Sequence, residues 1–95
     1  MTSKEFIDSL DLSDVPTSLS LPQQALWWDA KGDWKQAHDL IDQLSDAVSA
    51  HIHAYLHRVE GDQWNARYWY GRAKQPEFKG SLEEEWKYLV DKYFS

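Results

Sequence analysis

The sequence predicts an all-α domain of about five to six helices, built from two antiparallel helix hairpins stacked side by side. Three observations predict this fold: an internal repeat whose copies are 29 residues apart, a Gly-Asp pair in each copy, and apolar residues at helical spacing after each pair. We expect a single domain over residues 1–95, because a chain of this length builds one hydrophobic core.

The two copies of the repeat align without gaps, residues 25–37 on residues 54–66. They share the opening alanine, the Gly-Asp pair and the closing alanine. We expect Gly32 and Gly61 to end one helix in the left-handed conformation, and Asp33 and Asp62 to cap the next helix. So short a connection must fold the second helix back on the first.

Residue types at the helix ends divide the chain into four segments. They are residues 1–21 (a short helix and a connector), 22–45 (first hairpin), 46–75 (second hairpin) and 81–94 (C-terminal packing helix). Ser3 is expected to cap the first helix, and Pro22 suits the first residue of the second. Gln75-Pro76 is expected to end the fifth helix. The apolar face of the first helix would consist of Phe6, Ile7 and Leu10.

The last helix begins with a capping box, Ser81 with Glu84 three residues later. The run Glu83–Glu85 lies in its first turn, where acidic residues favour the helix dipole. Its apolar face is expected to cover the open end of the repeat. The residues of that face are Leu82, Trp86, Leu89, Val90 and Tyr93.

The composition restricts the class of protein. The net charge is -6, and residues 1–50 hold nine acids against three bases, so we expect no nucleic-acid binding. Cysteine is absent, the N-terminus resembles no signal peptide, and no apolar run is long enough for a membrane helix. We therefore expect a cytoplasmic protein with no membrane association and no cofactor. Six Trp and five Tyr serve a core or a recognition surface, and for most of them we expect the core.

The second hairpin resembles the tetratricopeptide repeat. The resemblance rests on a small residue in the first helix, the Gly-Asp turn, and the later Ala, aromatic, Ala and Pro positions. These are Ala54, Gly61-Asp62, Ala66, Tyr70, Ala73 and Pro76. The first hairpin is similar at fewer positions, and the 29-residue spacing is shorter than the usual repeat of about 34 residues. The resemblance implies a helical scaffold used for binding other molecules.

Two longer strings resemble the signatures of a family of small uncharacterised bacterial proteins. They are GDWKQAH at residues 32–38 and HAYLHRVEGDQWNARYWYGRA at residues 53–73. This resemblance implies a bacterial source and the same helical fold, and it implies no activity.

Histidines form the first candidate site. His53 and His57 are four residues apart on a predicted helix, and Glu60 follows on the same face. Two imidazoles and a carboxylate at this spacing can hold a divalent metal. The alternative, which we favour, is that both histidines pack against the partner helix, because the string HAYLH lacks the Glu of the metalloprotease motif and Arg58 lies nearby. His38 could face the same groove, together with Trp28 and Asp29.

A polar and aromatic stripe forms the second candidate site. It consists of Arg58, Asn65, Tyr68, Trp69 and Arg72, to which His57 is close. The last four lie at i, i+3, i+4 and i+7 of one helix, and such a composition is typical of recognition hot spots. Two arginines could hold a carboxylate or a phosphate. The alternative is an internal network in which either arginine pairs with Glu60 or Asp29.

We therefore expect an interaction module that binds a peptide segment or a small anionic ligand in the groove between the hairpins. Two alternatives remain open. One is a small metal-dependent or acid-base enzyme that uses His38, His53, His57 and Glu60, and the other is a structural subunit of a homodimer. No nucleophile motif or phosphate-binding loop is present in the sequence.

Overall fold

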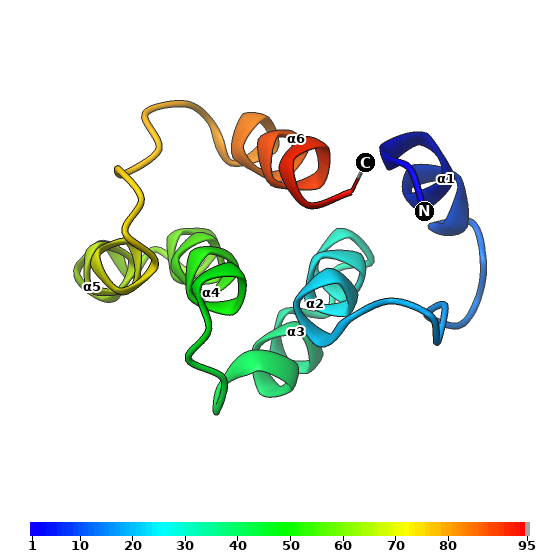
Figure 1. The fold of residues 1–95 in the computed structure, drawn as a ribbon, viewed down its shortest axis with the longest axis horizontal. Helices are drawn as coiled ribbons and strands as arrows, with labels where there is room; N and C mark the ends of the chain where they lie inside the picture. The colour runs from blue at the N-terminus through cyan, green and yellow to red at the C-terminus, as the bar shows by residue number, and fades with distance from the viewer. Residues whose placement is uncertain (95) are drawn as a thin grey trace.

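The computed structural model describes residues 1–94, which form six helices and no strand (Figure 1). The all-α fold class and the number of helices are therefore as predicted. The helices are α1 (Ser3–Ser9), α2 (Leu21–Ala30), α3 (Trp34–Ile41), α4 (Ala47–Val59), α5 (Gln63–Ala73) and α6 (Leu82–Tyr93).

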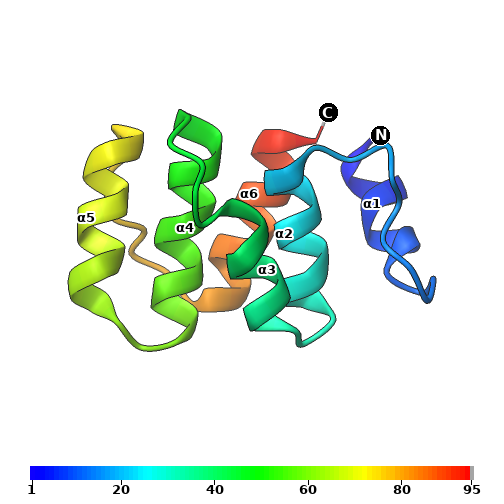
Figure 2. The same ribbon diagram turned by 90° about the horizontal axis from the view of Figure 1, so that it is seen from below.

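The two Gly-Asp pairs form the turns that the repeat predicts. Gly32 and Gly61 have φ values of 86° and 83°, in the left-handed region that favours glycine. Asp33 caps α3 by accepting from the backbone N–H of Gln36, and Asp62 caps α5 in the same way. Figure 2 shows the result, with α3 folded back beside α2 and α5 beside α4.

Helix α6 lies against α2 and α4, on the side away from α3 (Figure 1). Leu89 and Val90 of α6 are fully buried there against the core residues of α2 and α4. The N-terminal helix joins the same core through Phe6, whose ring stacks on Phe94 with 4.2 Å between the centroids. The two ends of the described chain are thereby held together.

Three helix ends differ from the sequence prediction. Thr2, not Ser3, caps α1, because Thr2 forms a capping box with Glu5. Helix α2 begins one residue before Pro22, with Ser20 as its cap. Helix α5 ends at Ala73, before Gln75-Pro76, because Lys74 adopts the left-handed conformation with φ 58°.

Helix α4 is the centre of the domain and contacts α2, α3, α5 and α6. Every residue from Ser49 to His57 is buried, including three histidines. None of the helices within residues 1–94 is both long and apolar enough to cross a bilayer. Buried polar side chains are unusual in a core helix, and those of α4 therefore indicate a candidate functional site.

Candidate functional site

Arg58, the first residue of the predicted binding stripe, is paired inside the protein. Its Nη1 lies 2.6 Å from Oε1 of Glu85, and its Nη2 donates to the carbonyl oxygen of Gly80 at 2.8 Å. Glu85 is fully buried, and its second oxygen accepts a hydrogen bond from the Tyr70 hydroxyl. The internal network that the sequence left open is therefore present at Arg58, with Glu85 as the partner rather than Glu60 or Asp29.

The four residues of the stripe on α5 have different surroundings. Asn65 belongs to the helix cap, where its Nδ2 donates to Asp62 at 2.6 Å. Arg72 donates to the Tyr68 hydroxyl at 2.9 Å, and its guanidinium lies 5.6 Å from the ring centre of Trp69. Tyr68, Trp69 and Arg72 thus form one contiguous group, whereas the guanidinium of Arg58 bonds Glu85 and Gly80.

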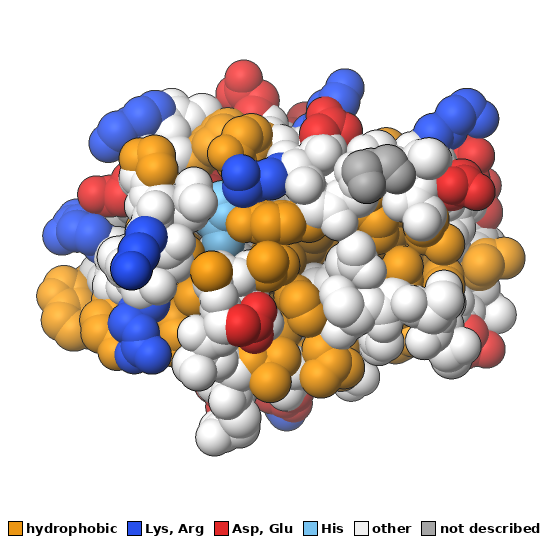
Figure 3. Space-filling model, viewed as in Figure 1, with side chains coloured by type: hydrophobic (Ala, Val, Ile, Leu, Met, Phe, Trp, Pro, Cys, Tyr) orange, Lys and Arg blue, Asp and Glu red, His pale blue; other side chains and the backbone are white. Residues whose placement is uncertain are grey.

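Two exposed residues that the sequence analysis did not select complete this surface. Trp64 is 71% exposed, and together with Arg67 and Tyr68 it lines a shallow hollow of about 250 Å³. We call Trp64, Arg67, Tyr68 and Arg72 the α5 face. Figure 3 shows several basic side chains on the side of the molecule where α5 lies. The signal was available in the sequence, because residues 63–74 hold three basic residues and no acidic one.

Three histidines from two helices form a second group, the histidine cluster. Nε2 of His38 on α3 lies 3.1 Å from Nε2 of His53 on α4. Each of His38, His53 and His57 offers one ring nitrogen to a group whose members all lie within 4.8 Å of one another. The predicted trio of His53, His57 and Glu60 is not the group of ligand atoms that comes together, because His38 takes the place of Glu60 beside the two other histidines. Oε1 of Glu60, the C-cap residue of α4, lies 2.5 Å from Nδ1 of His57.

Two tryptophans enclose the histidine cluster. The Trp34 ring stacks on His38 with 4.8 Å between centroids, and the Trp69 ring stacks on His53 at 3.9 Å. Burial, with the neighbouring His38 and His57, lowers the pKa of His53 to about 4, so that this ring is neutral at pH 7. Its Nδ1 is buried and has no hydrogen-bond partner among the described residues.

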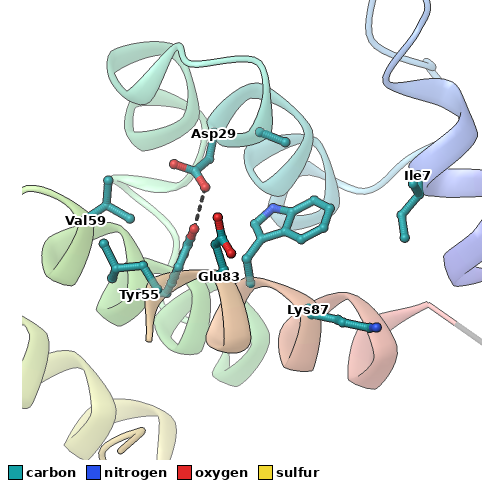
Figure 4. A pocket seen from close by; sticks show the side chains of 9 residues that line it. Ile7, Asp29, Tyr55, Val59, Glu83 and Lys87 are labelled. Carbon is teal, nitrogen blue, oxygen red and sulfur yellow. Dashed lines mark hydrogen bonds between the residues drawn. The ribbon is translucent and has the colours of Figure 1, made fainter. Parts of the chain in front are cut away.

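Another hollow lies between α1, α2, α4 and α6, on the side of the two hairpins that α6 covers (Figure 4). It has a volume of about 470 Å³ and mostly apolar walls, including Ile7, Val59 and Trp86. At one side the Tyr55 hydroxyl donates to Asp29 at 2.7 Å. Burial raises the pKa of the Asp29 carboxyl, and the Tyr55 hydrogen bond opposes that rise. With a carboxyl group in its wall, this hollow is a poor site for an anion.

Comparison of the chain with protein-family models, with curated proteins and with solved structures finds no match. The resemblance to a family of small bacterial proteins therefore stays a prediction from the sequence.

Proposed function

We propose that this domain is an interaction module, in which two tetratricopeptide-like hairpins carry a binding face for an acidic peptide segment on the outer side of α5. One observation carries the proposal: Trp64 and Tyr68 are exposed side by side on a helix that holds two arginines and no acidic residue. The location differs from the groove expected from the sequence, because Arg58 is paired with Glu85.

The aromatic residues of the α5 face are unusually exposed. Trp64 is 71% and Tyr68 48% exposed, whereas the domain buries Trp27 and Tyr70 almost completely. Large aromatic side chains are normally buried, and exposed Trp, Tyr and Arg together are the residue types of binding hot spots. A partner that covers Trp64 and Tyr68 would remove their apolar area from water.

The arrangement of charge selects the kind of peptide. At roughly 100° per residue, Arg67 and Arg72 lie on opposite flanks of the ridge formed by Trp64 and Tyr68. Arg67 has one acidic neighbour, Glu77, at 3.6 Å across the surface, and such an exposed pair contributes little. A segment with an apolar or aromatic residue between two acidic ones would fit both features, because guanidinium groups bind carboxylates in bidentate pairs.

Fluorescence anisotropy with labelled peptides tests the proposal. The probe is a short peptide with acidic residues on both sides of a Leu or Phe, and the comparison peptide carries Gln and Asn in place of the acids. We expect only the acidic peptide to bind, and the binding to weaken as the salt concentration rises. Trp64→Ala and the double variant Arg67→Ala/Arg72→Ala should each weaken binding by about tenfold or more.

The matched control is Tyr88→Ala, which removes another exposed aromatic residue, on α6. This variant should bind the acidic peptide as the native chain does. Equal binding of the neutral peptide, or unchanged binding by Trp64→Ala, would overturn the proposal. Light scattering of the free domain separates peptide capture from self-association through the same face.

A further inference from the structure

We propose that His38, His53 and His57 form a binding site for a transition-metal dication of the zinc class. The site uses residues from α3 and α4 and none of the four residues of the α5 face, and the Trp69 ring lies between His53 and Arg72 of that face. Imidazole nitrogen is a preferred ligand of zinc, nickel and copper, and a set of three histidines with a further open position is a known arrangement for zinc in proteins.

The distances between the ring nitrogens fit one ion. Two nitrogens that each lie about 2.0–2.1 Å from zinc at a tetrahedral angle are about 3.3 Å apart. Nε2 of His38 and Nε2 of His53 are 3.1 Å apart, and the nitrogen of His57 lies within 4.8 Å of both. A rotation of the His57 side chain that brings its nitrogen closer to the other two would complete the set.

The fold holds these rings before any ion binds. His53 and His57 are one turn apart on α4, and their rings stack with 4.8 Å between centroids. His38 is brought to them by the Gly32-Asp33 turn and is stacked on Trp34, whose Nε1 donates to the carbonyl oxygen of Leu56 at 2.7 Å. Ligands that are already positioned lose little conformational entropy on binding.

Two carboxylates occupy the positions expected around such a site. Glu60 contacts Nδ1 of His57 at 2.5 Å, which leaves Nε2 of that ring for the ion. A carboxylate on the second nitrogen of a metal-binding histidine orients the ring and makes it a better ligand. Asp42 lies 3.7 Å from Nε2 of His38 on the partly exposed side, where its oxygen or a water molecule would be the fourth ligand.

A different set, His57 with Glu60 and Asp62, is less suitable. These three groups also offer ligand atoms within 4.8 Å of one another. However, both oxygens of Asp62 already accept hydrogen bonds from Asn65 at the start of α5. An ion there would compete with the helix cap, whereas the three-histidine set uses nitrogens with no such role.

Hydrogen bonding alone does not account for the histidine cluster. His53 is buried, and only one of its two ring nitrogens has a partner among the described residues. A buried polar atom without a partner costs free energy, so a purely structural ring at this position would be better replaced by an apolar one. An ion bound at Nε2 leaves Nδ1 of His53 without a partner, so this cost is accepted in either state, and the three imidazoles placed together are the groups that an ion would use.

Metal titration of the tag-free, chelator-treated full chain tests this site. Calorimetry with ZnCl2 should show one ion bound per chain, and CoCl2 should give the visible absorption bands of four-coordinate cobalt. Zinc should also raise the melting temperature by mass action. The absence of binding by both metals would overturn the proposal.

Variants assign the ion to these residues. His38→Asn changes the least buried of the three ligands, and it should abolish the cobalt bands without unfolding the domain, as circular dichroism would check. Glu60→Gln should weaken zinc binding by about 10- to 100-fold. His51→Gln is the control, because His51 is buried on the same helix but bonds Tyr93 outside the cluster, and it should leave the affinity unchanged. Zinc binding that survives His38→Asn unaltered contradicts the assignment.

Discussion

The guanidinium of Arg58 lies 2.6 Å from the carboxylate of Glu85, and this ion pair joins α4 to the first turn of α6. The Glu85 side chain is fully buried, and the Tyr70 hydroxyl of α5 donates to its second oxygen. Three helices therefore share one buried charge. A carboxylate in such a place is tolerated only while its partners remain.

Arg58→Met should destabilise the domain strongly. The change leaves Glu85 buried without its cation, and breaking a buried ion pair on one side costs about 3–5 kcal/mol. Urea unfolding followed by circular dichroism measures the loss. The double variant Arg58→Met/Glu85→Gln should recover much of it, because no unpaired charge remains.

Arg72→Ala is the matched control for Arg58, since Arg72 is an exposed arginine whose hydrogen bond goes to the surface residue Tyr68. We expect its unfolding free energy to lie within about 0.5 kcal/mol of the native value. Similar losses in the two arginine variants would contradict the structural role that we assign to Arg58.

Gly61→Ala and Gly71→Ala should have opposite effects on stability. Neither added methyl group meets an atom within 4 Å, so the backbone conformation decides the outcome. Gly61 has φ 83°, where an L-residue costs about 1–2 kcal/mol, so Ala destabilises. Gly71 is inside α5, where Ala is favoured by about 0.5–1 kcal/mol. Thermal melts of the two variants check the signs, and a stabilising Gly61→Ala would contradict the turn geometry.

The helix hairpins could be predicted because their signals are local. Gly61 and Asp62 specify a helix end and a helix start within two residues, and the physical requirements are a left-handed backbone and a capping carboxylate. The Ser81–Glu84 capping box is equally local and is present in the structure. In contrast, Thr2 and Ser3 are both residue types that cap helices well. Which of the two caps α1 depends on where the helix begins, and the residue types alone do not decide this.

The partners of charged residues could not be predicted, because they depend on packing between distant segments. Glu85 stands in a run of three acids that fits a solvated first turn, and nothing in the run marks its third residue as buried. Its burial follows from how α6 packs on α4. Glu85 is 27 residues away from its partner Arg58 in the sequence. The histidine cluster combines a local signal with a distant one. His53 and His57 are neighbours because they are four residues apart on one helix, whereas His38 reaches them only through the packing of α3 on α4.

Asp29→Asn should stabilise the domain at pH 7. Burial raises the pKa of the Asp29 carboxyl in the fold, so the ionised form is less favourable there than in the unfolded chain. This penalty is present when the pH is above the folded pKa and disappears as the pH falls below the unfolded value near 4. The Asn side chain still accepts from Tyr55. Urea midpoints should therefore be higher for the variant at pH 7 and should converge with those of the native chain at pH 3.5.

His51 should make the domain sensitive to mild acid. Burial, with the nearby Lys92, lowers its folded pKa to about 4, whereas the unfolded value is about 6.5. The unfolded chain therefore binds a proton that the fold does not, and stability is lost as the pH falls from 6.5 to 4. The unfolding free energy is measured against pH in the presence of a chelator, so that no metal ion contributes. The His51→Gln variant should show a slope near pH 5 that is smaller by up to about 1.4 kcal/mol per pH unit. An unchanged slope would mean that His51 takes up its proton in the folded state, which its burial and the nearby Lys92 oppose.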